Sequence, residues 1–133
     1  MKTPNLINFK RIGKPTEGYI SIVESQNEIP FEIKRSFWTY FTPEEVVRGR
    51  HAHFETEMVL IALAGRIIVN TEMPDGKINV FILDKPDMGL YMPKLCWHTM
   101  QYSHSAVQLV LTSTEYSDSD YIRSYEEFKL LKK

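Results

Sequence analysis

The sequence predicts an all-β sandwich or barrel that ends in a short helix. Three observations support this fold class. Segments of alternating apolar and polar residues, rich in β-branched and aromatic types, recur along the chain, and turn-forming residues separate them. Only the C-terminus changes from a period of two to a period of three. With 133 residues and no internal repeat or linker, residues 1–133 are expected to form a single domain.

Six segments are expected to form strands. Five follow the alternating pattern, namely residues 19–23, 31–40, 66–71, 77–83 and 106–112. The sixth, residues 58–64, is almost entirely apolar, which is typical of a strand buried on both faces, although a buried helix would share this composition. The run Pro74-Asp75-Gly76 has the residue types of a tight turn, so it is expected to join two antiparallel strands.

The C-terminus is expected to form the short helix. The apolar residues spaced for one helix face are Ile122, Tyr125, Phe128 and Leu131. Ser124 and Glu127 have the spacing of a capping box, in which the serine hydroxyl binds a backbone N–H of the first turn.

Composition excludes several classes of protein. A net charge of −1 gives no support for nucleic-acid binding or for a basic membrane-binding patch. No apolar run approaches the ~18 residues of a membrane span, and the first residues lack the apolar stretch of a secretory signal. The single cysteine, Cys96, fits a reducing compartment. We therefore expect a cytoplasmic protein without a nucleic-acid or membrane partner.

His51 and His53 are the most informative candidate site residues. Alternate residues of a strand face the same side, so this pair places two imidazoles in one space. The unperturbed pKa of histidine, ~6.5, allows proton transfer near neutral pH, and imidazole is also a common metal ligand. The pair therefore indicates a proton-transfer site or a metal site, with two hydrogen-bonded structural histidines as the alternative.

A metal site would need further ligands. The spacing of His51, His53 and Glu57 is close to the metal-binding signature of the cupin barrels, in which two histidines and a glutamate hold a divalent ion. His98 or His104 could supply another imidazole. The direction in which Glu57 faces is left open by the sequence.

Two arginines precede the histidines. Regular alternation would point Arg48 and Arg50 away from the imidazoles, unless Gly49 marks a bulge that redirects one of them. Arg50 is interpreted as a solvated charge. Arg48 beside a proton-transfer pair indicates an anionic substrate, because arginine binds phosphate in a bidentate manner.

The Trp97-His98 pair gives two further candidates on opposite faces of one segment. Trp97 could pack in the core or provide a ring platform for a base or sugar. His98 shares its face with Cys96, which has no activating neighbour in the sequence and is interpreted as a small buried apolar residue.

Several motifs together resemble a known enzyme family. They are Lys34-Arg35, Arg48-Gly49-x-His51-Ala52-His53, Gly89-Leu90-Tyr91, Trp97-His98 and the tail Asp120-Tyr121-Ile122-Arg123-x-Tyr125. The sequence is similar to the dTDP-4-keto-6-deoxyglucose 3,4-ketoisomerases, small WxcM-like cupins of sugar-nucleotide pathways. The resemblance covers nearly the whole chain, from Ile7 to Phe128.

The resemblance implies a cupin-type β-jelly-roll barrel that forms a dimer, binds a dTDP-linked 4-keto-6-deoxy sugar and uses no metal or other cofactor. The implied reaction moves the carbonyl from C4 to C3 by proton transfer, in the biosynthesis of deoxyamino sugars for surface polysaccharides. Carried over by position, the motif histidines are His51 and His53 and the motif arginine is Arg48.

These features lead to one leading hypothesis and two alternatives. In the leading hypothesis His51 is the base and proton shuttle, His53 orients it or stabilises the oxyanion, and the substrate-binding residues are Arg48, Trp97 and His98. Phe37 stands where the family commonly has a tyrosine, which motivates the first alternative, a non-catalytic sugar-nucleotide-binding paralogue. The second alternative is a metal-dependent cupin enzyme.

The N-terminal segment also predicts assembly. Residues 6–23 carry apolar side chains but are too few for an independent sheet layer. Exchange of these strands with a second copy would bury them, so we expect a two-fold symmetric homodimer.

Overall fold

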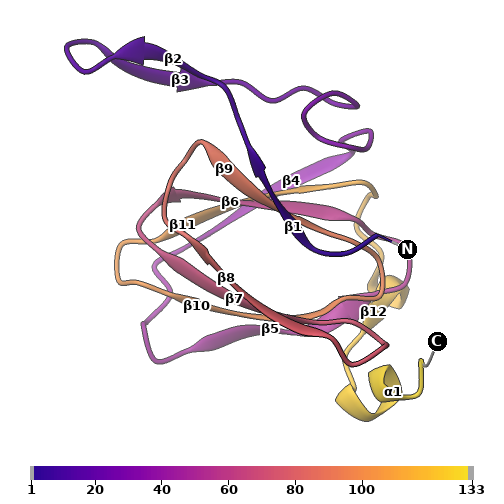
Figure 1. The fold of residues 1–133 in the computed structure, drawn as a ribbon. Helices are drawn as coiled ribbons and strands as arrows, with labels where there is room; N and C mark the ends of the chain where they lie inside the picture. The colour runs from indigo at the N-terminus through magenta and orange to yellow at the C-terminus, as the bar shows by residue number, and fades with distance from the viewer. Residues whose placement is uncertain (1, 132–133) are drawn as a thin grey trace.

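The computed structural model describes residues 2–131, and most of this chain is folded into two facing antiparallel sheets (Figure 1). The strands are β1 (Asn5–Asn8), β2 (Arg11–Lys14), β3 (Gly18–Ser21), β4 (Arg35–Tyr40), β5 (Val47–His53), β6 (Met58–Ala64), β7 (Ile67–Glu72), β8 (Ile78–Leu83), β9 (Met88–Met92), β10 (Trp97–Tyr102), β11 (Val107–Thr112) and β12 (Tyr121–Ile122). The helices are the 3₁₀ turn η1 (Asp118–Asp120) and α1 (Tyr125–Lys129).

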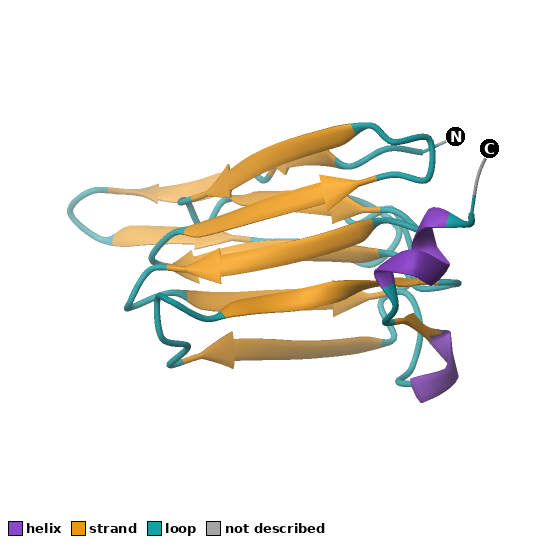
Figure 2. Ribbon diagram, turned by 90° about the horizontal axis from the view of Figure 1, so that it is seen from below, coloured by secondary structure: helices purple, strands orange, loops and turns teal. Residues whose placement is uncertain are grey.

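The strand order interleaves distant parts of the chain. One sheet has the order β1-β9-β6-β11-β4, the other has the order β12-β5-β10-β7-β8, and neighbouring strands in both are antiparallel. Strands that follow one another in sequence therefore often lie in opposite sheets, as in a jelly roll. Figure 2 shows the strands running side by side, with the short helices at one end. The predicted all-β fold with a short C-terminal helix is confirmed.

Strand β6 explains why the core has two parts. Met58, Leu60 and Ala62 face the space between the sheets, whereas Val59 and Ile61 belong to a second cluster on the outer face. The N-terminal third of the chain covers this outer face with Phe9, Ile29 and Phe31. The prediction of a strand buried on both faces is thus confirmed as far as Ala62; Leu63 is exposed.

The predicted turn at residues 74–76 is confirmed. The backbone N–H of Gly76 donates to the Met73 carbonyl at 2.9 Å, and Met73 N–H donates to the Lys77 carbonyl at 3.0 Å. Gly76 has a φ of +90°, a backbone conformation that favours glycine. The turn joins β7 to β8, which pair antiparallel.

Two predicted strands are too long at one end. The strand expected over residues 31–40 begins only at Arg35, because the preceding residues form a loop held by Ser25. Its hydroxyl accepts a hydrogen bond from Ile33 N–H at 2.8 Å, which draws the chain away from the sheet. The strand expected over residues 19–23 is β3, which ends at Ser21.

The C-terminal helix begins later than its apolar spacing indicates. Ser124 is the N-cap, and its hydroxyl accepts from Glu127 N–H at 3.2 Å, as the capping box predicts. Ile122, expected on the helix face, lies instead in β12, where it pairs with Ala52. Among the described residues, neither helix has the length and apolar character needed to cross a membrane.

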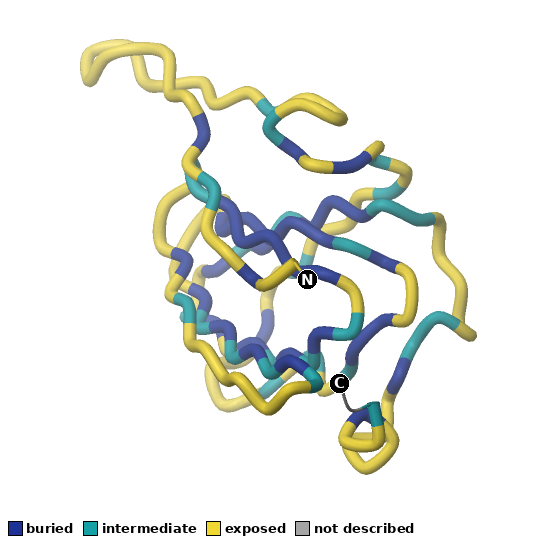
Figure 3. Tube along the Cα trace, turned by 45° about the vertical axis from the view of Figure 1, so that its right-hand side comes forward, coloured by how far each residue is buried: buried dark blue, intermediate teal, exposed yellow. Residues whose placement is uncertain are grey.

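The hairpin of β2 and β3 stands away from the two sheets (Figure 1). Its trace is exposed along its whole length (Figure 3), and the exposed residues include Ile12, Tyr19 and Ile20. The preceding strand, β1, pairs with β9 in the body of the same chain.

Candidate active site

A cavity of about 160 Å³ lies between the two sheets. Strands β5 and β10 contribute His51, His53 and His98 to its wall, and β12 contributes Tyr121. The facing sheet contributes the inward side chains of β4, among them Phe37. The two histidines predicted as catalytic and the one predicted as substrate-binding are therefore brought together in one cavity.

A β-bulge places Arg48 in the same cavity. The pairing of β5 with β10 shifts between His98, which is opposite His51, and Thr99, which is opposite Gly49. Gly49 and Arg50 have φ values of +89° and +62°, so the strand turns locally and its alternation is reset. Arg48 and His51 line one cavity although they are an odd number of residues apart. This is the bulge at Gly49 that the sequence left as a possibility.

Each of the three imidazoles is anchored through its Nδ1 atom. His51 Nδ1 lies 3.1 Å from the Gly49 carbonyl, and His98 Nδ1 lies 3.0 Å from the Cys96 carbonyl. His53 Nδ1 lies 3.0 Å from Oδ2 of Asp120. Because all three partners accept hydrogen bonds, a neutral imidazole here donates from Nδ1 and keeps the Nε2 lone pair free.

The rings form one cluster. The ring centroid of His51 lies 5.0 Å from that of His53 and 4.7 Å from that of His98. Tyr121 contacts this cluster with its ring 4.9 Å from His51 and 4.5 Å from His53. The four rings can therefore act on one small ligand.

Burial keeps these imidazoles neutral. Burial, reinforced by the neighbouring His53, lowers the pKa of His51 to about 4. Burial also lowers the pKa of His98 to about 3 and lowers the pKa of His53, although the hydrogen bond to Asp120 partly opposes this effect. At neutral pH each ring is therefore a neutral base that can accept a proton at Nε2.

Asp120 is a site residue that sequence reasoning recorded only as part of the tail motif. Besides His53, its carboxylate accepts hydrogen bonds from the Thr56 hydroxyl and, at 2.7 Å, from Glu55 N–H. Burial raises the pKa of Asp120, but the hydrogen bonds from Thr56, Glu55 and His53 outweigh it and hold that pKa below its ordinary value. Asp120 is therefore an anion that supports His53. The residues are 67 positions apart, so the strand pattern gave no sign of this pair.

Trp97, predicted as a substrate-binding residue, lies on the other side of β10. Its ring centroid is 5.3 Å from Tyr125 and 5.6 Å from Phe128, and it packs against the small core under helix α1. This position agrees with the core-packing alternative for Trp97.

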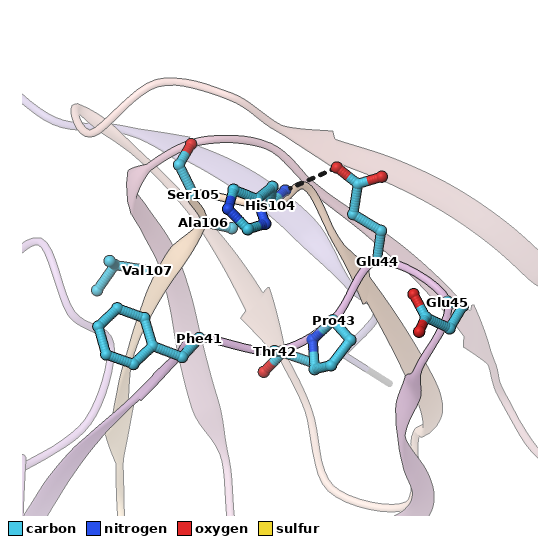
Figure 4. Close-up of a pocket in the computed structure, with 9 residues that line it drawn as sticks. All are labelled: Phe41, Thr42, Pro43, Glu44, Glu45, His104, Ser105, Ala106 and Val107. Atoms are coloured by element: carbon cyan, nitrogen blue, oxygen red, sulfur yellow. Dashed lines mark hydrogen bonds between the residues drawn. The ribbon is translucent and has the colours of Figure 1, made fainter.

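The other candidate metal ligands do not join the three imidazoles. Glu57 accepts hydrogen bonds from the Tyr91 hydroxyl at 2.5 Å and from Lys2 Nζ at 3.4 Å, next to a different pocket. His104 lies in the loop after β10, where its backbone N–H donates to Glu44 at 3.1 Å (Figure 4). Within residues 2–131, no group of three His, Cys, Asp or Glu side chains is arranged to hold a metal ion.

Cys96 is a buried thiol, as the sequence indicated. Its exposed fraction is 1%, and burial raises its pKa to about 12. A protonated thiol is a poor nucleophile, so Cys96 is not a candidate catalytic residue.

Comparison with known proteins identifies the family. Residues 2–133 match the family described as "FdtA: WxcM-like, C-terminal". The chain belongs to this family. A curated relative from Aneurinibacillus thermoaerophilus, "TDP-4-oxo-6-deoxy-alpha-D-glucose-3,4-oxoisomerase", is 41% identical over 128 residues, which cover 93% of this chain and 88% of the relative.

Solved structures of 3,4-ketoisomerases have the same fold. A 3,4-ketoisomerase from Helicobacter canadensis superposes with a TM-score of 0.91 at 36% identity, covering 96% of each chain. A second structure is a histidine-to-asparagine mutant of the 3,4-ketoisomerase QdtA from Thermoanaerobacterium thermosaccharolyticum in complex with TDP-4-keto-6-deoxyglucose. It also superposes with a TM-score of 0.91, at 32% identity, covering 97% of this chain and 93% of that one. The predicted family and the cupin-type fold are confirmed.

Proposed function

We propose that this protein is a TDP-sugar 3,4-ketoisomerase in which His51 moves the carbon-bound proton. The observation that carries the proposal is the cluster of neutral imidazoles with free Nε2 atoms in one cavity. The reaction class predicted from the sequence is confirmed by the relatives, which are named as 3,4-oxoisomerase or 3,4-ketoisomerase enzymes.

The chemistry requires two kinds of proton movement. A base removes the hydrogen on C3, which is acidic because C4 is a ketone, and an enediolate forms. A proton then returns to C4. The hydroxyl proton of O3 is transferred to O4, so that O4 becomes a hydroxyl. C3 is now the ketone, and no atom is gained or lost overall.

We assign the two kinds of movement to different imidazoles. His51 touches both neighbouring histidines, and it takes the proton from C3 and returns it to C4. His53 transfers the proton between O3 and O4. It becomes an imidazolium during this step, and the Asp120 carboxylate at 3.0 Å stabilises that charge.

The arginines supply the charge that a diphosphate needs. Arg48 and Arg35 both line the cavity, from opposite sheets. Guanidinium groups bind phosphate oxygens in a bidentate manner and remain charged at any physiological pH. The substrate of this protein is, in this proposal, a TDP-linked 4-keto-6-deoxyhexose, the class of ligand present in the QdtA complex. Its 3-keto product suits an aminotransferase that makes deoxyamino sugars for surface polysaccharides.

The variant His51→Asn tests the proposal. We expect TDP binding by calorimetry to be retained, because the arginines are unchanged. Exchange of the C3 hydrogen of TDP-4-keto-6-deoxyglucose in deuterated water, followed by NMR, should fall by ~10²–10⁴-fold. The control is His104→Asn, which changes an exposed histidine outside the cavity and should leave exchange intact. Undiminished exchange in His51→Asn would remove His51 from the mechanism.

We also propose that the protein works as a homodimer in the cytoplasm. The β2–β3 hairpin supports the dimer, because its exposed apolar residues have no cover within the described chain and could lie against a second copy. A reduced single cysteine supports the cytoplasm.

A further inference from the structure

Two threonine hydroxyls lie behind the carboxylate that supports His53. Thr56 Oγ1 is hydrogen-bonded to Oδ2 of Asp120, and it lies 2.6 Å from Oγ1 of Thr114. The exposed fraction of Thr56 is 1%, and Thr114 is half-buried. The proton transfers proposed above use neither hydroxyl, although both are connected to the imidazole cluster.

The direction of these hydrogen bonds follows from the charge of Asp120. The carboxylate of Asp120 is ionised at neutral pH, so it can only accept. Thr56 has one hydroxyl proton, and it donates that proton to Asp120. Toward Thr114, Thr56 Oγ1 can then only accept, so the Thr114 hydroxyl is the donor. The hydroxyls therefore point in one direction, from Thr114 through Thr56 to Asp120.

Thr114 is held in place by the sheet that faces His53. Its backbone carbonyl accepts from the Thr112 hydroxyl at 2.7 Å, and Thr112 Oγ1 accepts from Arg35 Nε at 3.2 Å. Thr112 is fully buried, and it is opposite Arg35 in the register of β11 with β4. The Thr114 hydroxyl is therefore fixed beside Thr56 by buried groups of the chain itself.

Thr56 and His53 share one oxygen atom of Asp120. His53 Nδ1 lies 3.0 Å from Oδ2, the atom to which Thr56 also donates, whereas Oδ1 accepts from Glu55 N–H at 2.7 Å. The hydrogen bond from Thr56 disperses part of the negative charge on Oδ2, which leaves less of it to attract a proton on His53. Donation from Thr114 polarises the Thr56 hydroxyl and strengthens this effect.

The other groups around His53 do not replace Asp120 in this role. Burial lowers the pKa of His53 most, the hydrogen bond and the charge of Asp120 raise it, and the charges of Arg35 and Arg123 lower it. The titratable rings that face His53 are those of His51, His98 and Tyr121. Within residues 2–131, Asp120 is thus the group that raises the pKa of His53, and a change in its hydrogen bonds reaches His53 directly.

We infer that Thr56 and Thr114 are positioning residues that set the basicity of His53 through Asp120. The inference rests on the proposed function, in which His53 transfers the proton between O3 and O4. For this transfer His53 must be neutral before it accepts the proton, and it must release the proton again afterwards. The two threonines serve both requirements, because they limit how strongly Asp120 holds a proton on His53.

The variant Thr56→Val tests the inference without turnover. Valine has the shape of threonine but no hydroxyl, so His53 becomes the only donor to Oδ2 of Asp120. NMR titration of the ligand-free protein should show a pKa of His53 that is higher than in the unmodified protein by roughly 0.5–1. Thr114→Val should raise the same pKa by a smaller amount, because Thr56 still donates.

Two comparisons separate this effect from a loosened cavity. Looser packing would raise the pKa values of His51 and His98 together with that of His53, because burial lowers all three. The inference requires that only the pKa of His53 moves. In the Asp120→Asn background there is no charge to disperse, so adding Thr56→Val should leave the titration of His53 unchanged.

The pH dependence of kcat/KM tests the effect on the reaction. In Thr56→Val the acidic limb of the profile should move to higher pH with the pKa of His53, so the rate falls more at pH ~6 than at pH ~8. Thr56→Ser retains the hydroxyl and should restore both the titration and the profile.

A matched control is Thr71→Val. Thr71 is also buried, with an exposed fraction of 2%, and its hydroxyl donates to the Asn79 carbonyl at 3.3 Å instead of to Asp120. This variant should leave the titration of His53 unchanged.

Several outcomes would overturn the inference. An unchanged or lower pKa of His53 in Thr56→Val would refute it, as would an equal rise at all three imidazoles. If Thr56→Val does not fold, an unchanged titration in Thr114→Val would refute it in the same way. If the unmodified protein does not isomerise the substrate, the proposed function fails and the role in the reaction fails with it. An unchanged titration in an active enzyme overturns the inference alone.

Discussion

Three histidines in one cavity share a tautomer but have different anchors. His51 and His98 donate from Nδ1 to backbone carbonyls, which hold the rings without charging them. Only His53 has a carboxylate partner, Asp120. A carboxylate favours the imidazolium, so His53 is the ring whose protonation during the reaction is least unfavourable. In the proposed reaction, this difference separates the ring that moves a proton on carbon, His51, from the ring that moves a proton on oxygen, His53.

The variant Asp120→Asn should slow the reaction more than it weakens binding. The amide keeps an oxygen that can accept from His53 Nδ1, but it lacks the charge that stabilises the imidazolium. We expect kcat to fall by about 10²-fold while the Kd for TDP changes little. NMR titration should also show the pKa of His53 falling, because Asp120 raises it. Asp118→Asn, which removes an exposed carboxylate paired with Arg123, is the control. Equal effects of the two variants on kcat would contradict the role of Asp120.

At the scale of elements, the bulge in β5 decides which side chains share the cavity. Without it, Arg48 would face away from His51, because the two are an odd number of residues apart. The bulge depends on Gly49, where a Cβ would lie 2.8 Å from the His98 carbonyl oxygen and 3.2 Å from Thr99 Cα, with φ at +89°. Glycine at this position serves both the backbone conformation and the close approach of β10.

Comparison of Gly49→Ala with Gly76→Ala tests the bulge. Both glycines have φ near +90°, so both variants incur the backbone cost of about 1 kcal/mol. Only at Gly49 does the new methyl group meet backbone atoms; at Gly76 nothing lies within 4 Å. Gly49→Ala should therefore lower Tm more than Gly76→Ala does. It should also weaken TDP binding, because Arg48 is redirected. Similar Tm values and TDP affinities for both variants would show that the bulge does not position Arg48.

At the scale of the whole molecule, the buried imidazoles couple folding to pH. The pKa values of His51 and His98 fall to about 4 and about 3 in the folded chain from an ordinary value of 6.5. At pH values between the folded-state pKa and the ordinary pKa, the unfolded chain binds more protons than the folded chain. The free energy of unfolding therefore rises with pH in this range. The stabilisation is present above pH ~6.5, and it is lost as the pH falls toward the folded-state values.

Denaturant unfolding at pH 7.5 and pH 5 should reveal this loss. At pH 5 the free energy of unfolding should be lower by on the order of 1–2 kcal/mol for each of the two rings, His51 and His98. The variant His98→Asn should reduce the difference between the two pH values, whereas His104→Asn, at an exposed position, should retain it. A protein equally stable at both pH values would contradict the assignment of neutral buried imidazoles.

Assembly is the second prediction at this scale. Light scattering at micromolar concentration should give twice the 15.6 kDa mass of one chain. Deleting the residues before Gly18 removes β2 from the exposed hairpin and also removes β1, and it should abolish both dimerisation and solubility. A mass near 15.6 kDa for the intact protein would refute the dimer, and a dimer formed by the shortened chain would refute the role of the hairpin.

The sequence by itself determined the fold class, most strands, the turn at residues 74–76, the helix cap at Ser124 and the family. These features depend on residues close together in the chain, whose spacing and type directly limit the local backbone. For the same reason the His51 and His53 pair could be assigned to one face. The prediction of one domain over residues 1–133 stays a prediction.

Only the tertiary structure decided which distant residues meet. Asp120 joins His53 through the pairing of β12 with β5, Trp97 faces the small core under α1, and Glu57 bonds to Tyr91 outside the cavity. The strand between residues 31 and 34 was overpredicted because Ser25 competes for its backbone hydrogen bonds. Contacts of this kind depend on sheet order and on the bulge at Gly49, and neither is set by the local pattern, because a single extra residue in one strand reverses every side chain beyond it.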